Sequence, residues 1–445
     1  MARLPLTVNL SAARGSPSRL TQAVAFLVGF GIQFNVLIGG GGEGVTAIGG
    51  FGFRLTDFMS AGAIALLCIF ALRPNRIMAV GIFALGVGIL ALLRILDPLF
   101  WVDPRTDILC LHYLGYSFAG LYFAMILRTR ATIDRFCWGL IVGMLLTVPI
   151  FVLQALGYAS TLVNFGLVPE YYTLFFYENN NLVRYSGLWG HPNEASHVAA
   201  LSAAAGAYFT FVYRRYLPLA LTAAGLLAIF YFTQSRGGLL VSGAVLAVPL
   251  LFGTRHQFNI LHVLLGIFVI GIVSLLVSQL DVIALRFTDA EAGHNFSERI
   301  ASTVAALQLL LSNPLGMPDS YFQLSLVHAV GVGSPHNGFI FFAAIFGLPP
   351  LTVLIVVFAV NLRRWHNDDA FFALFTFQIC LSFLFEQMAL SYCYALAICL
   401  LLGRAYLKTR LGAELVTQTR SAVSRMTAQR YLRRHAVDNS LASGE

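Results

Sequence analysis

The feature that most constrains this chain is a succession of apolar runs, each about 20 residues long, separated by short polar breaks. A run of that length crosses the hydrocarbon core of a bilayer as a helix. Hydrophobic residues make up 58% of the sequence and charged residues only 11%, and the mean hydropathy is +0.78. The alternating apolar and polar pattern of a membrane β-barrel is absent from the sequence. The sequence therefore predicts an all-α, polytopic membrane protein.

We expect about 12 transmembrane helices within one domain, residues 1–408, followed by a basic cytoplasmic tail, residues 409–445. The two spans on either side of residues 233–237 are short, so the pattern leaves open whether they are one span or two. The predicted spans are residues 21–40, 56–73, 77–97, 106–127, 136–157, 196–213, 216–233, 237–252, 259–280, 337–361, 370–387 and 389–407.

The distribution of basic residues predicts the orientation of the chain. With both termini in the cytoplasm, most of the 28 Lys and Arg residues fall in inner loops or in the tail. The net charge of +8 then reflects this orientation and the attraction of the tail for anionic membrane lipids, and it gives no indication of nucleic-acid binding. Two long loops, residues 158–195 and 281–336, are expected on the outer side.

The loop 281–336 contains a predicted helix. Asn295 and Glu298 have the spacing of a capping box, and the helix is expected to stop at Asn313-Pro314. We expect it to lie along the outer membrane surface, with Arg299 in its first turn. Its apolar face consists of Ile300, Val304, Leu307 and Leu311.

Other polar pairs and loops allow more ordinary interpretations. Arg54 with Asp57, and Arg94 with Asp97, have i,i+3 spacing and are expected to form local ion pairs at helix ends. The loop 158–195 carries aromatic residues beside Asn, Glu and Arg side chains. That composition fits sugar stacking and an interfacial aromatic belt equally well, and both interpretations stay open.

Arginines on the outer side indicate an anionic ligand. Arg236 lies between two apolar runs without an acid nearby in the sequence, and an arginine at membrane depth costs about 2.5–3.5 kcal/mol. Its planar guanidinium binds phosphate oxygens through two nitrogens. A lipid-linked diphosphate is such an anionic ligand, and its lipid chain lets it reach the site through the bilayer. The candidate site residues on this side are Arg184, His191, Asn193, Arg236, Arg286, Arg299, His336 and Asn337.

Three motifs in this order resemble the O-antigen ligase and O-antigen polymerase superfamily, over residues 180–360 and in the twelve-span layout. They are Arg184-x-x-Gly187-Leu188-x-Gly190-His191-Pro192-Asn193, Gln234-Ser235-Arg236-Gly237-Gly238, and Arg299 followed by Asn313-Pro314-Leu315-Gly316 and His336-Asn337. The segment Gly316-Met317-Pro318 departs from the more usual Gly-x-Gly, which leaves the path of that loop open.

The resemblance implies a metal-independent, cofactor-free glycosyltransferase of the bacterial inner membrane, with its active site facing the periplasm. It would transfer a glycan from an undecaprenyl-diphosphate carrier to an acceptor hydroxyl, with inversion. The acceptor is lipid A–core in a ligase of lipopolysaccharide biosynthesis, and a carrier-linked glycan in a polymerase of an exported polysaccharide. The resemblance maps diphosphate binding onto Arg184, Arg236 and Arg299, and the reacting centre onto His336.

A histidine suits the role of general base because its neutral imidazole is available near neutral pH. Asn337 is expected to orient the His336 ring or a sugar hydroxyl, and His191, Asn193 and Arg286 are supporting candidates. The alternative for His336 is an interfacial histidine bonded to Asn337 or to backbone. A small-solute transporter and an accessory subunit of a polysaccharide assembly machine remain the rival functions.

Overall fold

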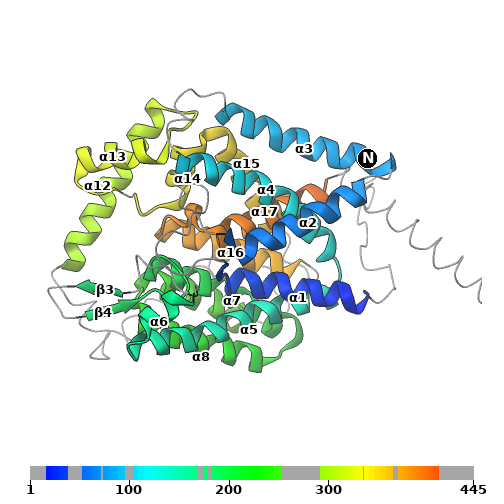
Figure 1. Cartoon of the computed structure of the whole chain (residues 1–445), viewed down its shortest axis with the longest axis horizontal. Helices are drawn as coiled ribbons and strands as arrows, with labels where there is room; N and C mark the ends of the chain where they lie inside the picture. Colours follow the sequence, from blue (N-terminus) through cyan, green and yellow to red (C-terminus); the bar gives the residue numbers. More distant parts are fainter. Residues whose placement is uncertain are drawn as a thin grey trace, which may run out of the picture.

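The computed structural model describes residues 17–38, 53–71, 74–95, 104–165, 167, 174–177, 182–252, 291–333, 335–363 and 369–409. Within these residues the architecture is all-α, with fifteen α-helices and two short antiparallel strand pairs (Figure 1). The strands are β1 (Leu37–Ile38), paired with β2 (Phe53–Arg54), and β3 (Leu174–Tyr177), paired with β4 (Leu182–Tyr185).

The helices fall into two sequential groups on either side of residues 253–290. The first group is α1 (Arg19–Gln33), α2 (Leu55–Ala71), α3 (Pro74–Ile95), α4 (Pro104–Ile126), α5 (Arg130–Ala155), α6 (Ala159–Asn164), α7 (Pro192–Tyr213), α8 (Tyr216–Thr233) and α9 (Arg236–Phe252). The second group is α12 (Glu291–Ser312), α13 (Asp319–Val330), α14 (Gly338–Phe346), α15 (Leu348–Leu362), α16 (Ala370–Phe385), the 3₁₀ helix η5 (Met388–Leu390) and α17 (Tyr392–Leu407).

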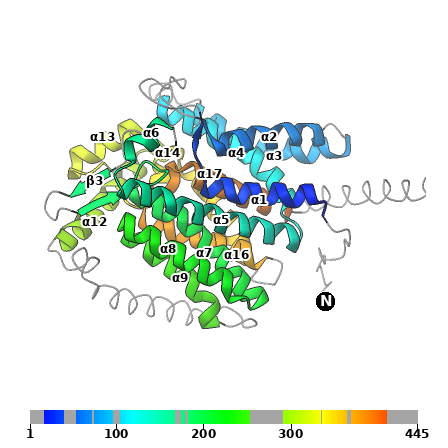
Figure 2. The same cartoon turned by 60° about the horizontal axis from the view of Figure 1, so that its bottom comes forward.

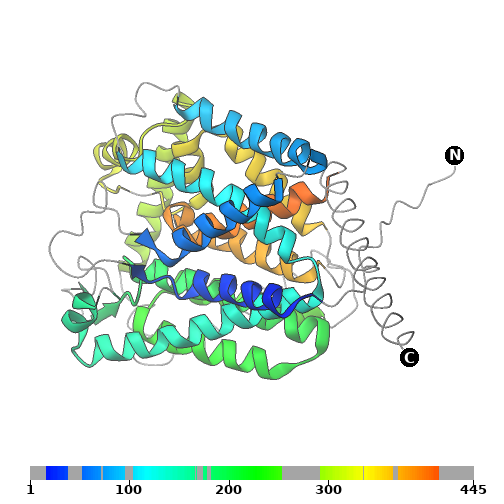
Figure 3. The ribbon, with the colours of Figure 1, turned by 45° about the vertical axis from the view of Figure 1, so that its right-hand side comes forward.

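The chain is a multi-pass membrane protein by the length and composition of its helices. In the described residues, α5, α7, α8 and the segment Leu109–Ile126 of α4 are long and apolar enough to cross a bilayer. Shorter apolar helices accompany them, including α2, α9, α15, α16 and α17. Most helices run roughly along one direction (Figure 3).

Two expectations about the spans can be compared with the helices. The short spans before and after residues 233–237 are separate helices, α8 and α9, as predicted. The single span expected over residues 337–361 is wrong, because Gly347 adopts φ +92° and divides it into α14 and α15. The span expected at 259–280 lies outside the described residues.

Helix α7 is the centre of the packing and supports the site at its N-terminal end. It packs against α5, α8, α9 and α16, and Figure 2 shows it among these helices. Almost all of its side chains are buried, and many of them are alanines, which allow neighbouring backbones to approach closely. Glycines do the same elsewhere. A side chain at Gly29 of α1 would collide with the Phe136 carbonyl oxygen of α5.

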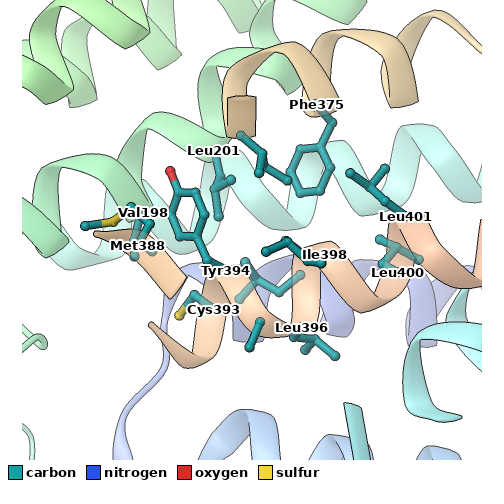
Figure 4. Close-up of a cluster of buried hydrophobic side chains, with 14 of the residues drawn as sticks. Val198, Leu201, Phe375, Met388, Cys393, Tyr394, Leu396, Ile398, Leu400 and Leu401 are labelled. Carbon is teal, nitrogen blue, oxygen red and sulfur yellow. The ribbon is translucent and has the colours of Figure 1, made fainter. Parts of the chain in front are cut away.

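The core between α7, α16 and α17 is closed by large apolar side chains (Figure 4). Val198, Leu201, Phe375 and Tyr394 are all fully buried there. The Tyr394 hydroxyl lies 2.8 Å from the carbonyl oxygen of His197, so this aromatic residue ties α17 to α7 by a hydrogen bond as well as by packing.

Helix α12 differs from its predicted form at its start. It begins at Glu291, so Asn295 and Glu298 are both inside the helix, and the expected capping box is wrong. The i,i+3 spacing of these residues fits a helix interior as well as a cap. For the same reason Arg299 does not lie in the first turn. The predicted apolar face, Ile300, Val304, Leu307 and Leu311, is between 45% and 69% exposed, as a face directed at lipid would be.

The segment after α12 has a definite path set by two glycines. Gly316 adopts φ +91° and lies against the break between α14 and α15, where Gly347 is also left-handed. A Cβ at Gly316 would lie 2.5 Å from the Ile345 oxygen. The backbone N–H of Met317 donates to the oxygen of Ala344 at 2.7 Å. The motif Asn313-Pro314-Leu315-Gly316 therefore fastens α12 to α14.

The local ion pair expected between Arg54 and Asp57 is wrong. Asp57 accepts the backbone N–H of Arg54 at 2.8 Å, as acidic residues near a helix start commonly do. Its other oxygen accepts the Tyr116 hydroxyl at 2.6 Å and lies 3.2 Å from His112 Nε2. The Arg54 guanidinium lies over the Tyr392 ring instead, 5.2 Å from its centroid. The pair expected at Arg94 and Asp97 includes a residue outside the described ones.

Candidate functional site

His336 occupies an unusual backbone position directly before α14. Its φ is +47°, a left-handed conformation that residues other than glycine rarely adopt. Its side chain is 27% exposed, and its Nδ1 lies 3.2 Å from Glu386 Oε1. The next residue, Asn337, caps α14, since its Oδ1 accepts the backbone N–H groups of Phe339 and Ile340 at 3.1 Å.

Glu386 is the site residue that sequence reasoning missed. It follows α16 in the connection to η5, and its side chain is only 8% exposed. Its Oε2 accepts a hydrogen bond from Asn193 Nδ2 at 2.9 Å, while Oε1 faces His336. The sequence carries one signal for it. Glu386 is the only acidic residue between Asp369 and Glu414, at the end of an apolar run. A lone carboxylate in that position is a functional candidate.

The environment of Glu386 keeps it ionised. Burial opposes the charged form, but the hydrogen bond and charge of His336, together with the charges of His197 and Arg299, outweigh it and lower the pKa of Glu386 to about 2. An ionised carboxylate only accepts hydrogen bonds. The Nδ1 of His336 therefore donates the hydrogen in this contact, and Nε2 is the ring nitrogen that faces neither oxygen of Glu386.

Arg184 extends this arrangement toward β4 and α8. Its side chain is 3% exposed, with Nε donating to the Thr233 carbonyl oxygen and Nη2 donating to Asn193 Oδ1, both at 2.6 Å. A continuous chain of hydrogen bonds thus joins Arg184, Asn193, Glu386 and His336, which come from three distant parts of the sequence. Arg184 brings positive charge to the site, but two of its nitrogens already donate to protein oxygens.

The start of α7 holds Asn193 in place. Pro192 occupies the first turn, where the missing N–H of proline has no intrahelical partner to lose. His191 is the N-cap residue, and its Nδ1 accepts the backbone N–H of Asn193 at 3.1 Å. His191 therefore contacts the backbone of Asn193, whose side chain belongs to the chain of hydrogen bonds.

Arg236 is the first residue of α9 and is half-buried. The two glycines after it bring this helix start onto α7. A Cβ at Gly237 would lie 2.9 Å from His197 Nε2, and one at Gly238 would collide with the Ser196 side chain. The glycines of the Arg236-Gly237-Gly238 motif are thus required by packing. They set the backbone of Arg236 beside the first turns of the helix that carries Asn193.

Arg299 lies next to Glu386, because its Nη1 donates to the Phe385 carbonyl oxygen at 3.2 Å. Arg286 is outside the described residues. A second missed residue is His197, which is fully buried, with Nδ1 3.0 Å from Ser382 Oγ, and whose charge acts on Glu386. In the part of the chain that the structure describes, no group of three or more His, Cys, Asp or Glu side chains is arranged to hold a metal ion.

The combined arrangement offers two kinds of chemistry at one end of the bundle. The imidazole of His336, oriented by an ionised carboxylate, can accept a proton. The charges of Arg184 and Arg299, with Arg236 at the neighbouring helix start, favour an anion or a developing negative charge. In Figures 1 and 2, β3 and β4 lie at the same end of the molecule as α12 and α13.

Comparison with known proteins agrees with the motifs. A search among curated proteins found no match. The family model described as O-antigen ligase matches residues 220–355, from α8 into α15. That range contains Arg236, Arg299 and His336, whereas Arg184 and Glu386 lie outside it. Residues 220–355 are therefore a domain of the O-antigen ligase and polymerase family of membrane proteins, which act in polysaccharide biosynthesis.

Proposed function

We propose that this protein transfers a glycan from an undecaprenyl-diphosphate carrier to an acceptor hydroxyl at the periplasmic face of the bacterial inner membrane. Its family domain implies a glycosyltransferase-type enzyme with lipid-linked glycan substrates. The observation that carries the finer proposal is the contact between His336 and the buried, ionised Glu386, with Asn193 and Arg184 connected to it by hydrogen bonds.

In this mechanism the acceptor hydroxyl gives its proton to His336 Nε2 as its oxygen attacks the anomeric carbon of the donor sugar. The bond between that carbon and the carrier diphosphate breaks, and the bonding electrons leave with the diphosphate. Attack opposite the leaving group inverts the anomeric configuration. The carboxylate of Glu386 stabilises the imidazolium that forms and keeps the ring in one orientation.

The arginines have a complementary role. A diphosphate leaving group requires charge stabilisation more than protonation, and guanidinium groups in a water-poor site supply it. Arg236 and Arg299 are the proposed phosphate ligands. Arg184, whose Nε and Nη2 are engaged, adds charge and fixes Asn193. The proposed transfer has no metal-dependent step, so chelation by EDTA should leave the rate unchanged.

The decisive test separates donor binding from transfer in purified protein. We expect His336→Ala to retain donor binding and to lower single-turnover transfer by ~10²-fold or more, which is the contribution typical of a general base. His328→Ala, at an exposed histidine in the last turn of α13, is the matched control and should transfer normally.

Two results would contradict the assignment of His336. Loss of donor binding with normal turnover at saturating donor would make it a substrate ligand, and unchanged binding and turnover would make it an interfacial histidine. The acceptor is a separate question, because ligase and polymerase share the donor chemistry. Free polymer without attachment in a deletion strain indicates a ligase, and single repeats on the core indicate a polymerase.

A further inference from the structure

A second group of polar side chains lies on segments that adjoin the proposed reacting centre in the sequence, and it has no part in the mechanism above. It consists of Arg54, the last residue of β2 directly before α2, Glu194 in the first turn of α7 and Tyr392 at the start of α17. The Arg54 guanidinium lies 5.2 Å from the Tyr392 ring centroid. The charges of both Arg54 and Glu194 act on the Tyr392 side chain.

The charged side chains of this group have no polar partner in the part of the chain that the structure describes. Arg54 and Glu194 are both half-buried, yet among the described residues neither side chain forms a hydrogen bond or an ion pair. The guanidinium nitrogens of Arg54 and the carboxylate oxygens of Glu194 remain accessible to solvent, so a ligand can reach them. A guanidinium with unused donors and a carboxylate with unused acceptors are available to a ligand.

The group is also firmly supported from behind. Asp57 holds the backbone of Arg54, and it is itself held by Tyr116 and His112. The His112 ring packs against Tyr392 with their centroids 4.7 Å apart. This network fixes the ring and the backbone of Arg54, so the two are ordered before any ligand arrives. Such preorganisation lowers the entropy lost on binding.

The sequence connects this group directly to the reacting centre. Glu194 follows Asn193, which donates to Glu386. Tyr392 is separated from Glu386 only by the connection that contains η5. That connection is tied to α4, where the Tyr113 hydroxyl donates to the Ala389 carbonyl oxygen at 2.9 Å. Glu194 and Tyr392 therefore stand on segments of the chain that also carry Asn193 and Glu386.

The chemistry of the group matches a neutral saccharide better than a phosphate. One cation and one anion balance each other here, whereas the region of Arg184, Arg236 and Arg299 carries excess positive charge. We propose that Arg54, Glu194 and Tyr392 form a saccharide-binding subsite for the acceptor glycan. Glu194 accepts hydrogen bonds from sugar hydroxyls, Arg54 donates to hydroxyl or ring oxygens, and Tyr392 provides an apolar edge. The role as an acceptor subsite depends on the proposed function, but saccharide binding itself does not.

The test uses direct binding and catalysis side by side. The binding probe is the oligosaccharide released by mild acid from the surface polysaccharide of the source bacterium, observed by saturation-transfer NMR with the full chain in nanodiscs. We expect Glu194→Gln and Arg54→Gln each to weaken binding about 10-fold or more, as loss of a charged hydrogen bond implies. In the transfer assay they should raise the acceptor KM by a similar factor, with the donor KM and kcat unchanged.

Control variants keep the result interpretable. Tyr392→Phe retains the ring and should bind nearly as wild type, whereas Tyr392→Leu should not. Tyr321→Leu, at a 45% exposed tyrosine of α13, should have no effect. Unchanged saccharide binding and unchanged acceptor KM in folded Glu194→Gln and Arg54→Gln would overturn the subsite and leave the transferase proposal intact. Wild-type protein that binds the saccharide through these residues but transfers no glycan would overturn the transferase proposal instead.

Discussion

At the scale of single residues, the carboxylate of Glu386 is the point where side chains from distant parts of the chain meet. His336, Asn193, Arg184 and Arg299 were all candidates, and the structure brings them around one carboxylate. That carboxylate, Glu386, was missed because it lies 50 residues from its histidine and 193 from its asparagine. No helical or strand periodicity relates positions so far apart, so only tertiary packing creates the pair.

The low pKa of Glu386 predicts acid sensitivity of the fold. Its folded-state pKa is about 2, below the ordinary value of 4.5, so its stabilising contribution is complete above about pH 5 and is lost as the pH falls toward 2. Thermal unfolding of purified protein should therefore show a melting temperature that falls over this range. In Glu386→Gln the slope should be shallower and stability at pH 7 lower. An identical acid slope in the variant would mean that other carboxyl groups dominate.

If Arg236 binds phosphate, its positive charge and its planar geometry should contribute separately to the rate of transfer. Arg236→Ala should lower single-turnover transfer by ~10²-fold or more, the usual effect of removing a donor to a developing anion. Arg236→Lys should recover only part of this loss, because lysine keeps the charge and loses the planar fork. Arg363→Ala, at an exposed arginine after α15, is the matched control. Full activity of well-expressed Arg236→Ala would reduce Arg236 to a packing or topology role.

At the scale of elements, hydrophobic runs predicted the helices well and their ends poorly. The capping pattern at Asn295 and Glu298 failed because the helix continues to Glu291. The span over 337–361 failed because a local apolar pattern does not reveal the close approach of another segment at Gly347. The backbone of Gly316 occupies that position, and the pairing of the two glycines across 31 positions has no local signature.

This pairing predicts that Gly316 and Gly347 act together. Alanine at Gly347 would place a Cβ 2.6 Å from the Leu315 oxygen, in addition to the strain of a left-handed φ. Gly316→Ala and Gly347→Ala should each lower the melting temperature and the yield of folded protein. Gly331→Ala is the matched control, because Gly331 has φ +76° but no atom within 4 Å of an added Cβ. It should lose only about 1–2 kcal/mol, from backbone strain alone. Equal effects in all three variants would exclude the backbone contact as the cause.

At the scale of the whole molecule, the composition and the apolar runs of the sequence are sufficient to predict the structural class. An all-α, multi-pass membrane protein follows from apolar runs alone, and the described helices agree with it. Orientation is a different kind of inference, because it depends on the distribution of charge between loops and on the membrane outside the protein. The proposed function requires that orientation, because it places the transfer from the undecaprenyl-diphosphate carrier on the periplasmic side.

Cysteine labelling in intact cells tests the orientation. We expect Ser312→Cys, at the end of α12, to react with a membrane-impermeant maleimide from outside, and Tyr216→Cys, at the start of α8, to react only after the membrane is opened. Both native side chains are exposed. The six native cysteines all lie within helices, so the wild-type chain provides the background signal. The basic residues near Tyr216, among them Arg214 and Arg215, predict a cytoplasmic location there. The reverse labelling pattern would place His336, Glu386 and the proposed acceptor subsite at the cytoplasmic face and would contradict the proposed function. The predictions for Gly316, Gly347 and the pH dependence would stand, because they concern folding alone.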